Sequence, residues 1–501
     1  MTDTVKIQLN VPREILEITK TLQNKPVVRP GKGFLAYLVG GCVRDSLIGR
    51  EPKDWDITTN AKPEEIIPLF TKTVYENKFG TVTVVNEEVG DEKLKNVEIT
   101  PFRTEAEYSD RRHPDEVKFS DKLEDDLSRR DFTINALAYD PEAGELIDLY
   151  GGIKDINDHT LRTVGKADER LTEDALRMLR AIRFASELRF TCNNELLESI
   201  SRNNTLIKEI SAERVRDELV KIIDSPEPMA GLILSHKTGL LRHILPELEA
   251  SIGVEQKGEH IYDVWEHTLR ALQHAADKGY PLHVKLAALL HDIGKPKTRR
   301  KGLKGKEYTF YGHEVVGERI VINIMARLKF PNKLADLVVN MVRNHMFFAD
   351  PDKITLSAVR RVIANVGPEN IWDLMNLRIC DRIGMGRPKE EPYRLRKYES
   401  MIEEALRAPT SVGMLKIDGK RVMKVTHETP GPKIGYILNA LLEEALENPD
   451  INNETFLMKR AGELVKLSGN ELKDLAERGK NKKEEVEQGE LKKIRAKYRV
   501  K

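Results

Sequence analysis

Residues 38–45 read Leu-Val-Gly-Gly-Cys-Val-Arg-Asp, and residues 53–58 read Lys-Asp-Trp-Asp-Ile-Thr. Side chains two residues apart on a β-strand point to the same face, so on a strand here Asp54 and Asp56 would lie together. Two carboxylates on one face can hold Mg²⁺. A pair of such ions can bind both the attacking and the leaving oxygen of an in-line phosphoryl displacement. This stretch therefore predicts a metal site for phosphoryl transfer.

The glycine pair in the first stretch fits the same chemistry. Gly40 and Gly41 have no Cβ, so their backbone would let a triphosphate approach closely, and Arg44 is placed to pair with phosphate oxygens. The alternative is a surface Asp-x-Asp beside an ordinary Gly-Gly turn. Each half alone favours that alternative, whereas the two together at this spacing favour the phosphate site.

Two later segments offer further groups for this site. Glu98 lies in Val-Glu-Ile, where the apolar neighbours would face the core and Glu98 the opposite side. It would be a third carboxylate that binds metal or helps to deprotonate the attacking hydroxyl, or else a solvent-facing glutamate. Arg130 follows Arg129 just before an apolar segment and would contact phosphates, or else form a structural salt bridge.

The composition predicts a globular protein. The chain has 501 residues, of which 40% are hydrophobic and 33% are charged, and its net charge is +1, so any surface for nucleic acid must come from local clusters. We expect no membrane span and no signal peptide. The odd, scattered set of Cys42, Cys192 and Cys380 favours a reducing compartment, so we expect a cytoplasmic protein.

The fold class follows from a change of pattern along the chain. Residues 34–150 alternate short β-rich runs with turns, which predicts an α+β head with a small, mostly antiparallel sheet and helices. From about Asp168 the pattern is that of amphipathic helices through to the end. The rest of the chain is therefore expected to be all-α.

The segment 173–183, Glu-Asp-Ala-Leu-Arg-Met-Leu-Arg-Ala-Ile-Arg, predicts a helix on which every third residue is polar: Asp174, Arg177, Arg180 and Arg183. Cytosine and adenine both present an amino donor beside a bare ring nitrogen. The carboxylate of Asp174 and the guanidinium of Arg177 complement that pair, whereas uracil and guanine present a carbonyl beside a ring N–H. The pair would accept C and A, although a surface ion pair is the alternative.

These segments resemble the class II tRNA nucleotidyltransferases, or CCA-adding enzymes, which share their catalytic head with bacterial poly(A) polymerases. The resemblance covers residues 38–59, 130–136, 148–152, 173–183 and 213–219. It implies that Asp54 and Asp56 bind the catalytic metals and that Asp174 and Arg177 read the base. It also implies nucleotide contacts from Gly41, Arg44, Arg130, Arg180 and Arg183.

The reaction that the resemblance implies is attack of the tRNA 3′-hydroxyl on the α-phosphate of CTP or ATP, repeated to build C-C-A without a nucleic-acid template. Residues 103–119, with Tyr-Ser-Asp-Arg-Arg-His-Pro at 108–114, resemble the flexible loop that this family needs for adenosine addition. The alternative is poly(A) addition. It is disfavoured because residues 78–82 read Lys-Phe-Gly-Thr-Val where those polymerases carry a Gly-Arg-Arg-Phe-like signature.

A second constellation lies in the helical part. Histidine and aspartate on separate helices are good metal ligands. The basic set resembles the HD-superfamily metal phosphohydrolases, and two further histidines would enlarge it enough for a second metal. The set is His267, His291, Asp292 and Asp381, with His313 and His345 as the additions. We expect a divalent metal of unknown identity here and a phosphohydrolase activity, although lone helical histidines are usually structural.

The resemblance divides the chain into a nucleotidyltransferase head (1–165), a helical neck and body for base and RNA binding (166–250), an HD-type domain (251–400) and a helical tail (401–501). The expected partners are tRNA, CTP and ATP. The composition leaves the oligomeric state open. Two other functions stay possible at this point: an HD phosphohydrolase whose head only binds RNA, and a tRNA-binding chaperone without catalysis.

Overall fold

The computed structural model describes residues 3–24, 34–76, 80–105, 117–256, 261–302, 308–347, 354–407 and 412–500. The predicted flexible-loop motif at 108–114 and the Lys-Phe pair at 78–79 lie outside the described residues. The chain forms two compact units, which we call the first unit (Met1–Arg343 with Cys380–Arg387) and the second unit (Asn344–Ile379 with Pro388–Lys501). The four predicted domain boundaries stay a prediction.

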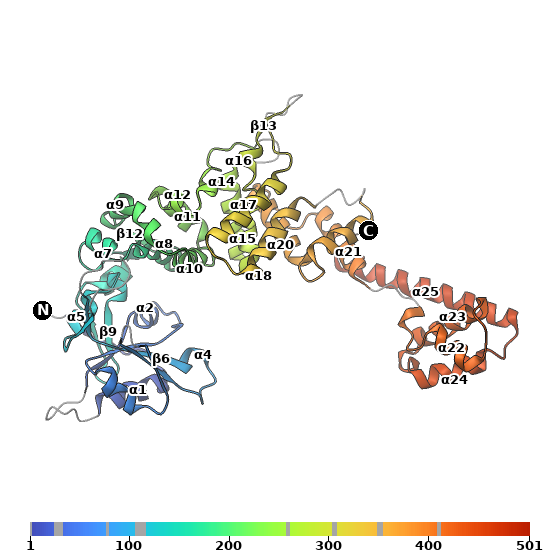
Figure 1. Cartoon of the computed structure of the whole chain (residues 1–501), viewed down its shortest axis with the longest axis horizontal. Helices are drawn as coiled ribbons and strands as arrows, with labels where there is room; N and C mark the ends of the chain where they lie inside the picture. Colours follow the sequence, from blue (N-terminus) through green and yellow to red (C-terminus); the bar gives the residue numbers. More distant parts are fainter. Residues whose placement is uncertain are drawn as a thin grey trace. The chain divides into compact units, whose positions relative to one another are not determined.

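An eight-stranded sheet forms the head at the N-terminal end (blue to cyan in Figure 1). Its strands pair antiparallel except for the parallel pair β3–β6, which confirms the predicted mostly antiparallel sheet. The strand order is β1 (Asp3–Lys6), β10 (Glu145–Asp148), β9 (Leu137–Asp140), β2 (Ala36–Val39), β3 (Asp56–Thr59), β6 (Asn96–Pro101), β5 (Thr81–Val85) and β4 (Thr73–Glu76).

Strand β3 is shorter than the sequence predicts. It begins at Asp56, so Asp54 lies in the bend before the strand. The reason is the length of its partner: β2 pairs only as far as Leu38 with Ile57, and Gly40 then turns the chain into α2 (Gly41–Leu47) with a φ of +82°. A residue before Asp56 therefore has no strand to pair with on that side. Trp55 is nevertheless buried, as expected.

Mostly helices follow the head in the rest of the first unit, which confirms the predicted change of pattern, but two short strand pairs interrupt the expected all-α region: β11 (Thr160–Leu161) with β12 (Thr191–Cys192), and β13 (Arg300–Lys301) with β14 (Tyr308–Thr309). One hydrophobic core runs from the head into these helices. The helices that carry the sites are α7 (Ala167–Glu173), α8 (Leu176–Leu188), α10 (Ala212–Ile223), α14 (Val264–Asp277), α15 (Leu282–Leu290), α16 (Lys295–Thr298), α17 (His313–Arg327), α18 (Asn332–Asn344) and α20 (Ile371–Gly384).

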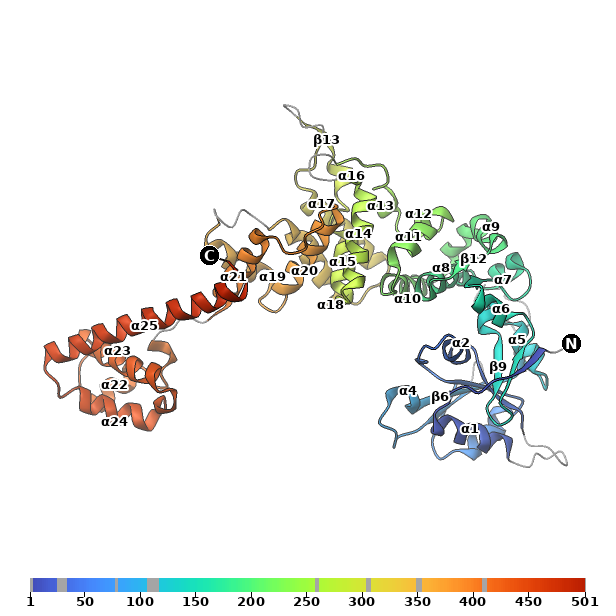
Figure 2. The ribbon, with the colours of Figure 1, turned by 180° about the vertical axis from the view of Figure 1, so that it is seen from behind.

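The second unit is helical as well (orange to red in Figure 2). The long helix α25 (Gly469–Lys497) packs on α23 (Pro432–Glu447), where a Cβ at Gly479 would lie 2.3 Å from the carbonyl oxygen of Asn439. Only glycine permits this approach. The other helices are α19 (Leu356–Val366), α21 (Tyr393–Leu406), α22 (Gly419–Thr426) and α24 (Glu454–Leu464). Among the described residues, no helix has the length and hydropathy needed to span a bilayer.

Candidate nucleotide and metal sites

A cavity of about 700 Å³ lies in the first unit, beside the start of α2 and the N-terminal end of β3. The structure brings eight of the predicted residues into its wall: Gly40, Gly41, Arg44, Asp54, Asp56, Arg130, Arg180 and Arg183. Sequence reasoning missed several others, among them Arg50, Lys53, Asp131, Asn135, Phe184, Glu187 and Lys221. Residues 90 or more positions apart in the chain thus share one cavity.

Asp54 and Asp56 line this cavity, whereas Glu98, the third predicted carboxylate, is not among its described lining residues. Asp56 and Glu98 are direct neighbours on the parallel pair β3–β6, and Glu98 is exposed while Val97 and Ile99 are buried, as predicted. Burial, and then the charges of Asp54 and Glu98, raise the pKa of Asp56 to about 7. The oxygens thus repel one another when all are ionised, and a hard divalent cation would relieve that repulsion. This donor set fits Mg²⁺.

The glycine pair lies against both the carboxylates and the arginines. A Cβ on Gly40 would lie 2.9 Å from Nη1 of Arg130 and 4.0 Å from Oδ2 of Asp56. A Cβ on Gly41 would lie 4.0 Å from Oδ1 of Asp54. The backbone here therefore forms part of the cavity surface, open to a triphosphate in the way that the sequence predicts.

The arginines of the cavity are held by carboxylates and amides behind them. Arg44 donates from Nη1 to Oδ1 of Asn135 at 2.6 Å, and Arg130 donates from Nη2 to Oδ2 of the fully buried Asp126 at 3.1 Å. Burial alone would raise the pKa of Asp126, but the charges of Arg130 and Arg129 outweigh it and lower that pKa. Such pairs fix guanidinium groups before a phosphate arrives.

Helix α8 supplies the other two arginines. Arg180 donates from Nε and Nη2 to Oδ2 of Asp131 at 2.8 and 2.6 Å, and Arg183 donates to Glu218 at 3.2 Å. Between them, the ring of Phe184 lies 4.1 Å from the guanidinium carbon of Arg183. The cavity lining thus holds several oriented arginines, which suit the oxygens of a triphosphate.

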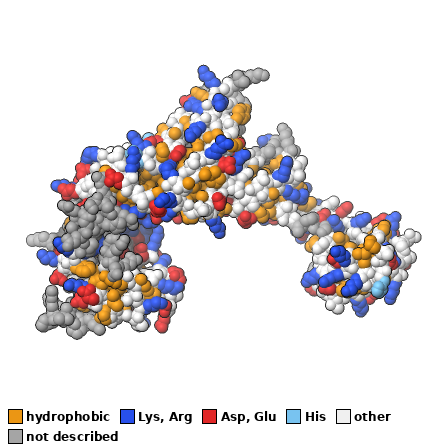
Figure 3. All heavy atoms as spheres, in the orientation of Figure 1, with side chains coloured by type: hydrophobic (Ala, Val, Ile, Leu, Met, Phe, Trp, Pro, Cys, Tyr) orange, Lys and Arg blue, Asp and Glu red, His pale blue; other side chains and the backbone are white. Residues whose placement is uncertain are grey.

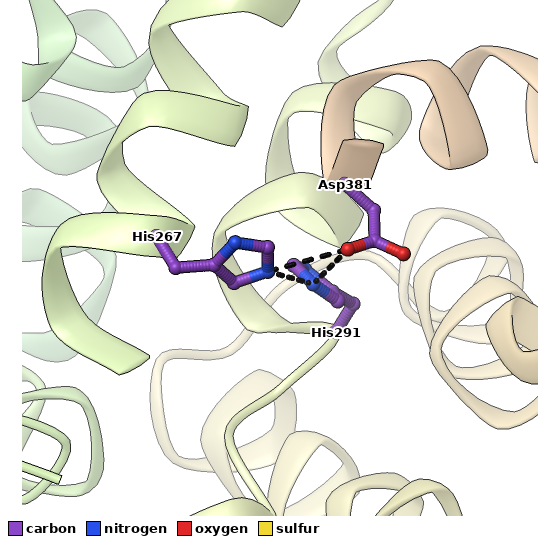
Figure 4. A group of neighbouring side chains, drawn as sticks. All are labelled: His267, His291 and Asp381. Carbon is purple, nitrogen blue, oxygen red and sulfur yellow. Dashed lines mark hydrogen bonds and ion pairs between the residues drawn. The ribbon is translucent and has the colours of Figure 1, made fainter. Parts of the chain in front are cut away.

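A second cluster lies in the helical part of the first unit (Figure 4). His267 comes from α14, His291 directly follows α15, and Asp381 comes from α20. Nε2 of His267 lies 3.0 Å from Nε2 of His291 and 3.3 Å from Oδ1 of Asp381, and all three side chains are buried. Ligand atoms of these three residues lie within 4.8 Å of one another, which is an arrangement that can hold a metal ion.

Asp292 and His313 lie at the same cluster. Oδ2 of Asp292 lies 3.2 Å from Nε2 of His267, and Oδ1 lies 3.3 Å from Nε2 of His313. Burial opposes the charge of His291, but Asp292 and Asp381 outweigh it and raise the pKa of His291 to about 10. The carboxylates thus favour a positive charge at this point. The same carboxylates would stabilise a bound cation.

Lys295 is a contact that the sequence analysis did not assign. Its ammonium donates to Oδ2 of Asp292 at 2.5 Å and to Oε1 of Gln256. His345, the remaining predicted ligand, is buried at the start of η4 (His345–Phe347) in the second unit, and its role as a ligand stays a prediction.

Comparison with known proteins bears on both sites. Family models match the poly A polymerase head domain over residues 36–162, the probable RNA and SrmB-binding site of polymerase A over residues 189–252, and the HD domain over residues 260–382. The CCA-adding enzyme of Lactobacillus johnsonii is 47% identical over 213 residues, which are 42% of this chain and 52% of that enzyme. Over this stretch the chain is similar to the CCA-adding enzymes, and residues 36–162 match the poly A polymerase head domain.

Other members of the CCA-adding family give the same result. The enzyme of Geobacillus kaustophilus is 46% identical over 221 residues, or 44% of this chain and 53% of that enzyme. The crystal structure of the Bacillus stearothermophilus CCA-adding enzyme in complex with CTP covers 89% of this chain and 97% of its own, with 28% identity and a TM-score of 0.58. This chain spans about half the length of the curated relatives it matches.

The helix that carries Asp174 differs from the sequence prediction. Helix α7 ends at Glu173, Asp174 is extended, and α8 begins at Leu176, so residues 173–183 do not form one helix. The physical reason is capping: Oδ1 of Asp174 accepts from the backbone N–H of Leu176 at 3.0 Å, and the other oxygen accepts from Arg214 at 2.8 Å. Aspartate is a strong helix-capping residue, so Asp174 could have indicated the start of a new helix, whereas the three-residue spacing of the polar residues predicted one continuous helix.

Arg177 points to partners other than Asp174. It donates to the carboxylate of Glu173, to the carbonyl oxygen of Arg170 at 2.9 Å and to that of Arg129 at 3.2 Å. Neither Asp174 nor Arg177 is among the described residues that line the cavity. Arg177 nevertheless contacts Arg129, and the next residue in the chain, Arg130, lines the cavity.

Proposed function

We propose that this chain adds C-C-A to the 3′ end of tRNA, using CTP and ATP and no nucleic-acid template. The observation that carries the proposal is the cavity whose lining includes the paired carboxylates Asp54 and Asp56, the glycine turn and four predicted arginines. The similarity to CCA-adding enzymes over 213 residues, and the match of residues 36–162, which include both carboxylates, to the poly A polymerase head domain, support the same reaction. We also propose that the protein works in the cytoplasm, consistent with its three free cysteines.

Asp54 and Asp56, with Glu98 beside them, would hold Mg²⁺, which fits the raised pKa of Asp56. Bound Mg²⁺ supplies Lewis-acid stabilisation of the phosphoryl oxygens. The tRNA 3′-hydroxyl oxygen forms the new bond to the α-phosphorus, the bond to the β-phosphate oxygen breaks, and pyrophosphate leaves. A nearby carboxylate accepts the hydroxyl proton.

The arginines bind the triphosphate and neutralise the charge that develops on pyrophosphate. Arg44 and Arg130 contact it from the glycine side, and Arg180 and Arg183 contact it from α8. Each is already held by an amide or carboxylate, so little side-chain entropy is lost when the nucleotide binds.

Asp174 and Arg177 would read the base through hydrogen bonds that only cytosine and adenine can complete. For this they must exchange their present partners, Arg214 and Glu173, for the base. The exchange replaces one set of charge-assisted hydrogen bonds by another, which keeps its net cost small.

The test is incubation of the purified protein with tRNA lacking its 3′ end, Mg²⁺, and each NTP singly and in mixture, with the products sequenced. We expect C-C-A addition that stops after one A. The variant Asp54→Asn should lose activity by more than about a thousandfold, whereas Asp158→Asn, an exposed aspartate of the head, should keep it. Long A tracts would mean a poly(A) polymerase, and no extension by the wild-type chain would refute the proposal.

The second cluster favours an additional activity. We propose that His267, His291, Asp292 and Asp381, with His313 and His345, bind a divalent metal and hydrolyse phosphoesters, a function of the matched HD domain type. A bound metal would lower the pKa of a water molecule. The test is metal content by mass spectrometry and hydrolysis of bis-p-nitrophenyl phosphate with Mg²⁺, Mn²⁺, Ni²⁺ or Co²⁺. Absence of both metal and hydrolysis would refute it.

A further inference from the structure

A small β-hairpin projects beside the second metal cluster (near the label β13 in Figures 1 and 2). Its strands β13 (Arg300–Lys301) and β14 (Tyr308–Thr309) pair antiparallel, with Arg300 opposite Thr309 and Lys301 opposite Tyr308. We call residues 299–302 and 308–312 the basic hairpin. It connects the end of α16 to the start of α17.

Three cations at the basic hairpin or two residues before it have no ion-pair partner among the described residues, whereas Arg299 pairs with Glu255 at 3.8 Å. Lys297, Arg300 and Lys301 are exposed, and the described residues place no carboxylate in an ion pair with any of them. Lys and Arg side chains are visible at this end of the first unit in Figure 3. Other long basic side chains that the structure describes in this unit, such as Arg327 and Lys329, pair with glutamate. The unpaired cations favour an anionic partner.

Aromatic side chains lie on β14 and just after it, on the strand that pairs with the basic strand β13. The guanidinium of Arg299 lies 3.7 Å from the ring centroid of Tyr308, and Tyr311 is 81% exposed, more than any other large hydrophobic side chain that the structure describes. An exposed ring beside unpaired cations suits a partner that has both flat rings and a negative backbone. Single-stranded nucleic acid has both, because bases stack on aromatic rings while phosphates meet Lys and Arg.

The hairpin is directly continuous with the metal cluster. At one foot, the ammonium of Lys295 lies 5.7 Å from the ring centroid of Phe310 and bonds to Asp292. At the other foot, Nδ1 of His313 lies 2.8 Å from the carbonyl oxygen of Phe310, and Nε2 of the same ring lies 3.3 Å from Asp292. A strand bound to the hairpin is therefore held next to the residues of the cluster.

We propose that the basic hairpin binds single-stranded RNA, with a base stacked on Tyr311 and phosphates on Arg300 and Lys301. The surface is separate from the nucleotide cavity of the head, whose lining includes none of these residues. The inference concerns binding alone, so it holds whether or not the metal cluster hydrolyses the bound strand.

The test uses the full-length chain and a fluorescein-labelled, 12-nucleotide RNA without secondary structure, followed by anisotropy at several salt concentrations. The double variant Arg300→Glu/Lys301→Glu should weaken binding at least tenfold and reduce the slope of log K against log[salt] by about 1.4, because two phosphate contacts are lost. Tyr311→Ala should weaken binding by about fivefold to a hundredfold without changing that slope. The matched control Lys6→Glu/Lys154→Glu makes the same change in net charge at two exposed lysines of the head.

A second readout locates the bound strand. The same RNA carrying 4-thiouridine should photocross-link to the peptide that contains Tyr308 and Tyr311. Equal weakening by the control variant, cross-links confined to other peptides, or equally tight binding of duplex RNA or polyglutamate would each overturn the proposal. Addition to tRNA should be unchanged in the hairpin variants. An inactive wild-type chain would count against the proposed function of the head and not against the hairpin.

Discussion

Phe184 on α8 is the side chain most worth perturbing in the nucleotide cavity. Its buried ring lies 5.0, 5.5 and 4.1 Å from the guanidinium carbons of Arg44, Arg180 and Arg183. Three like charges around one ring repel one another, and the negative faces of the ring offset that repulsion. We therefore expect Phe184 to position the arginines that bind the triphosphate, and we propose Phe184→Leu, which keeps an apolar side chain and removes the ring.

The magnitude follows from the three contacts. Taking the close, buried Arg183 at about 2 kcal/mol and the two longer contacts at about 0.5 kcal/mol each gives an upper limit of about 3 kcal/mol. These contacts exist before the nucleotide arrives, so only the cost of repositioning the arginines enters the affinity. We expect about 1–2 kcal/mol, which is roughly a 5- to 30-fold rise in KM with little change in kcat.

The assay is single-nucleotide addition to tRNA lacking its 3′ end, with KM and kcat measured separately for CTP and ATP. The rise in KM should be equal for both nucleotides, because the arginines bind phosphates and not the base. Phe184→Tyr retains the ring and should restore KM to within about threefold. The control Phe190→Leu truncates a buried ring that contacts His159 and should lower only the melting temperature. A normal KM in Phe184→Leu would refute the positioning role.

Three further predictions concern other parts of the chain. Asp174→Ala should increase misincorporation of U and G at least about tenfold, measured by sequencing the products, and strict C-then-A order in this variant would contradict the assignment. Asp381→Asn should lower divalent-metal affinity more than about tenfold in equilibrium dialysis while nucleotide addition stays normal. Burial, and then the charge of Glu391, raise the pKa of Glu399 to about 7, above its unfolded value. The ionised side chain therefore destabilises the fold above about pH 7, and this destabilisation disappears as the pH falls toward 4.5. Glu399→Gln should therefore raise the melting temperature at pH 8 and not at pH 4.5, and an equal effect at both would contradict the shift.

Much of the head could be predicted because its signals are local. Alternation of apolar and polar residues placed Val97 and Ile99 in the core and Glu98 on the other face, and the structure confirms this. Alternation of apolar and polar residues does not show which other strand a given strand pairs with. The parallel pairing that sets Glu98 beside Asp56 joins residues 42 positions apart, and it depends on packing of the whole sheet.

The same limit applies to the cavity wall. Gly40, Asp54 and Asp56 share one short segment, so their common site could be inferred from spacing. Phe184 and Lys221 carry no motif of their own that marks a nucleotide site. They enter the wall because α8 packs against the head, where the rings of Phe184 and Phe132 lie 5.7 Å apart, and because α10 packs on α8. The HD-type cluster was predictable because His-Asp-Ile-Gly-Lys-Pro is specific, whereas the contact of Lys295 with Asp292 required the fold.

The break between α7 and α8 changes how base selection would operate. A continuous helix would fix Asp174 and Arg177 as rigid neighbours, whereas here each is held by a separate partner, Arg214 on α10 and Glu173 on α7. If the pair reads the base, a nucleotide must displace Arg214 from Asp174, and only cytosine and adenine offer an amino donor to Asp174 together with a bare ring nitrogen to Arg177. In the same pose, uracil and guanine would place a carbonyl oxygen against the carboxylate and a ring N–H against the guanidinium, so Asp174 would return to Arg214. Selection would then rest on competition between the base and Arg214, and not on the shape of a preformed pocket.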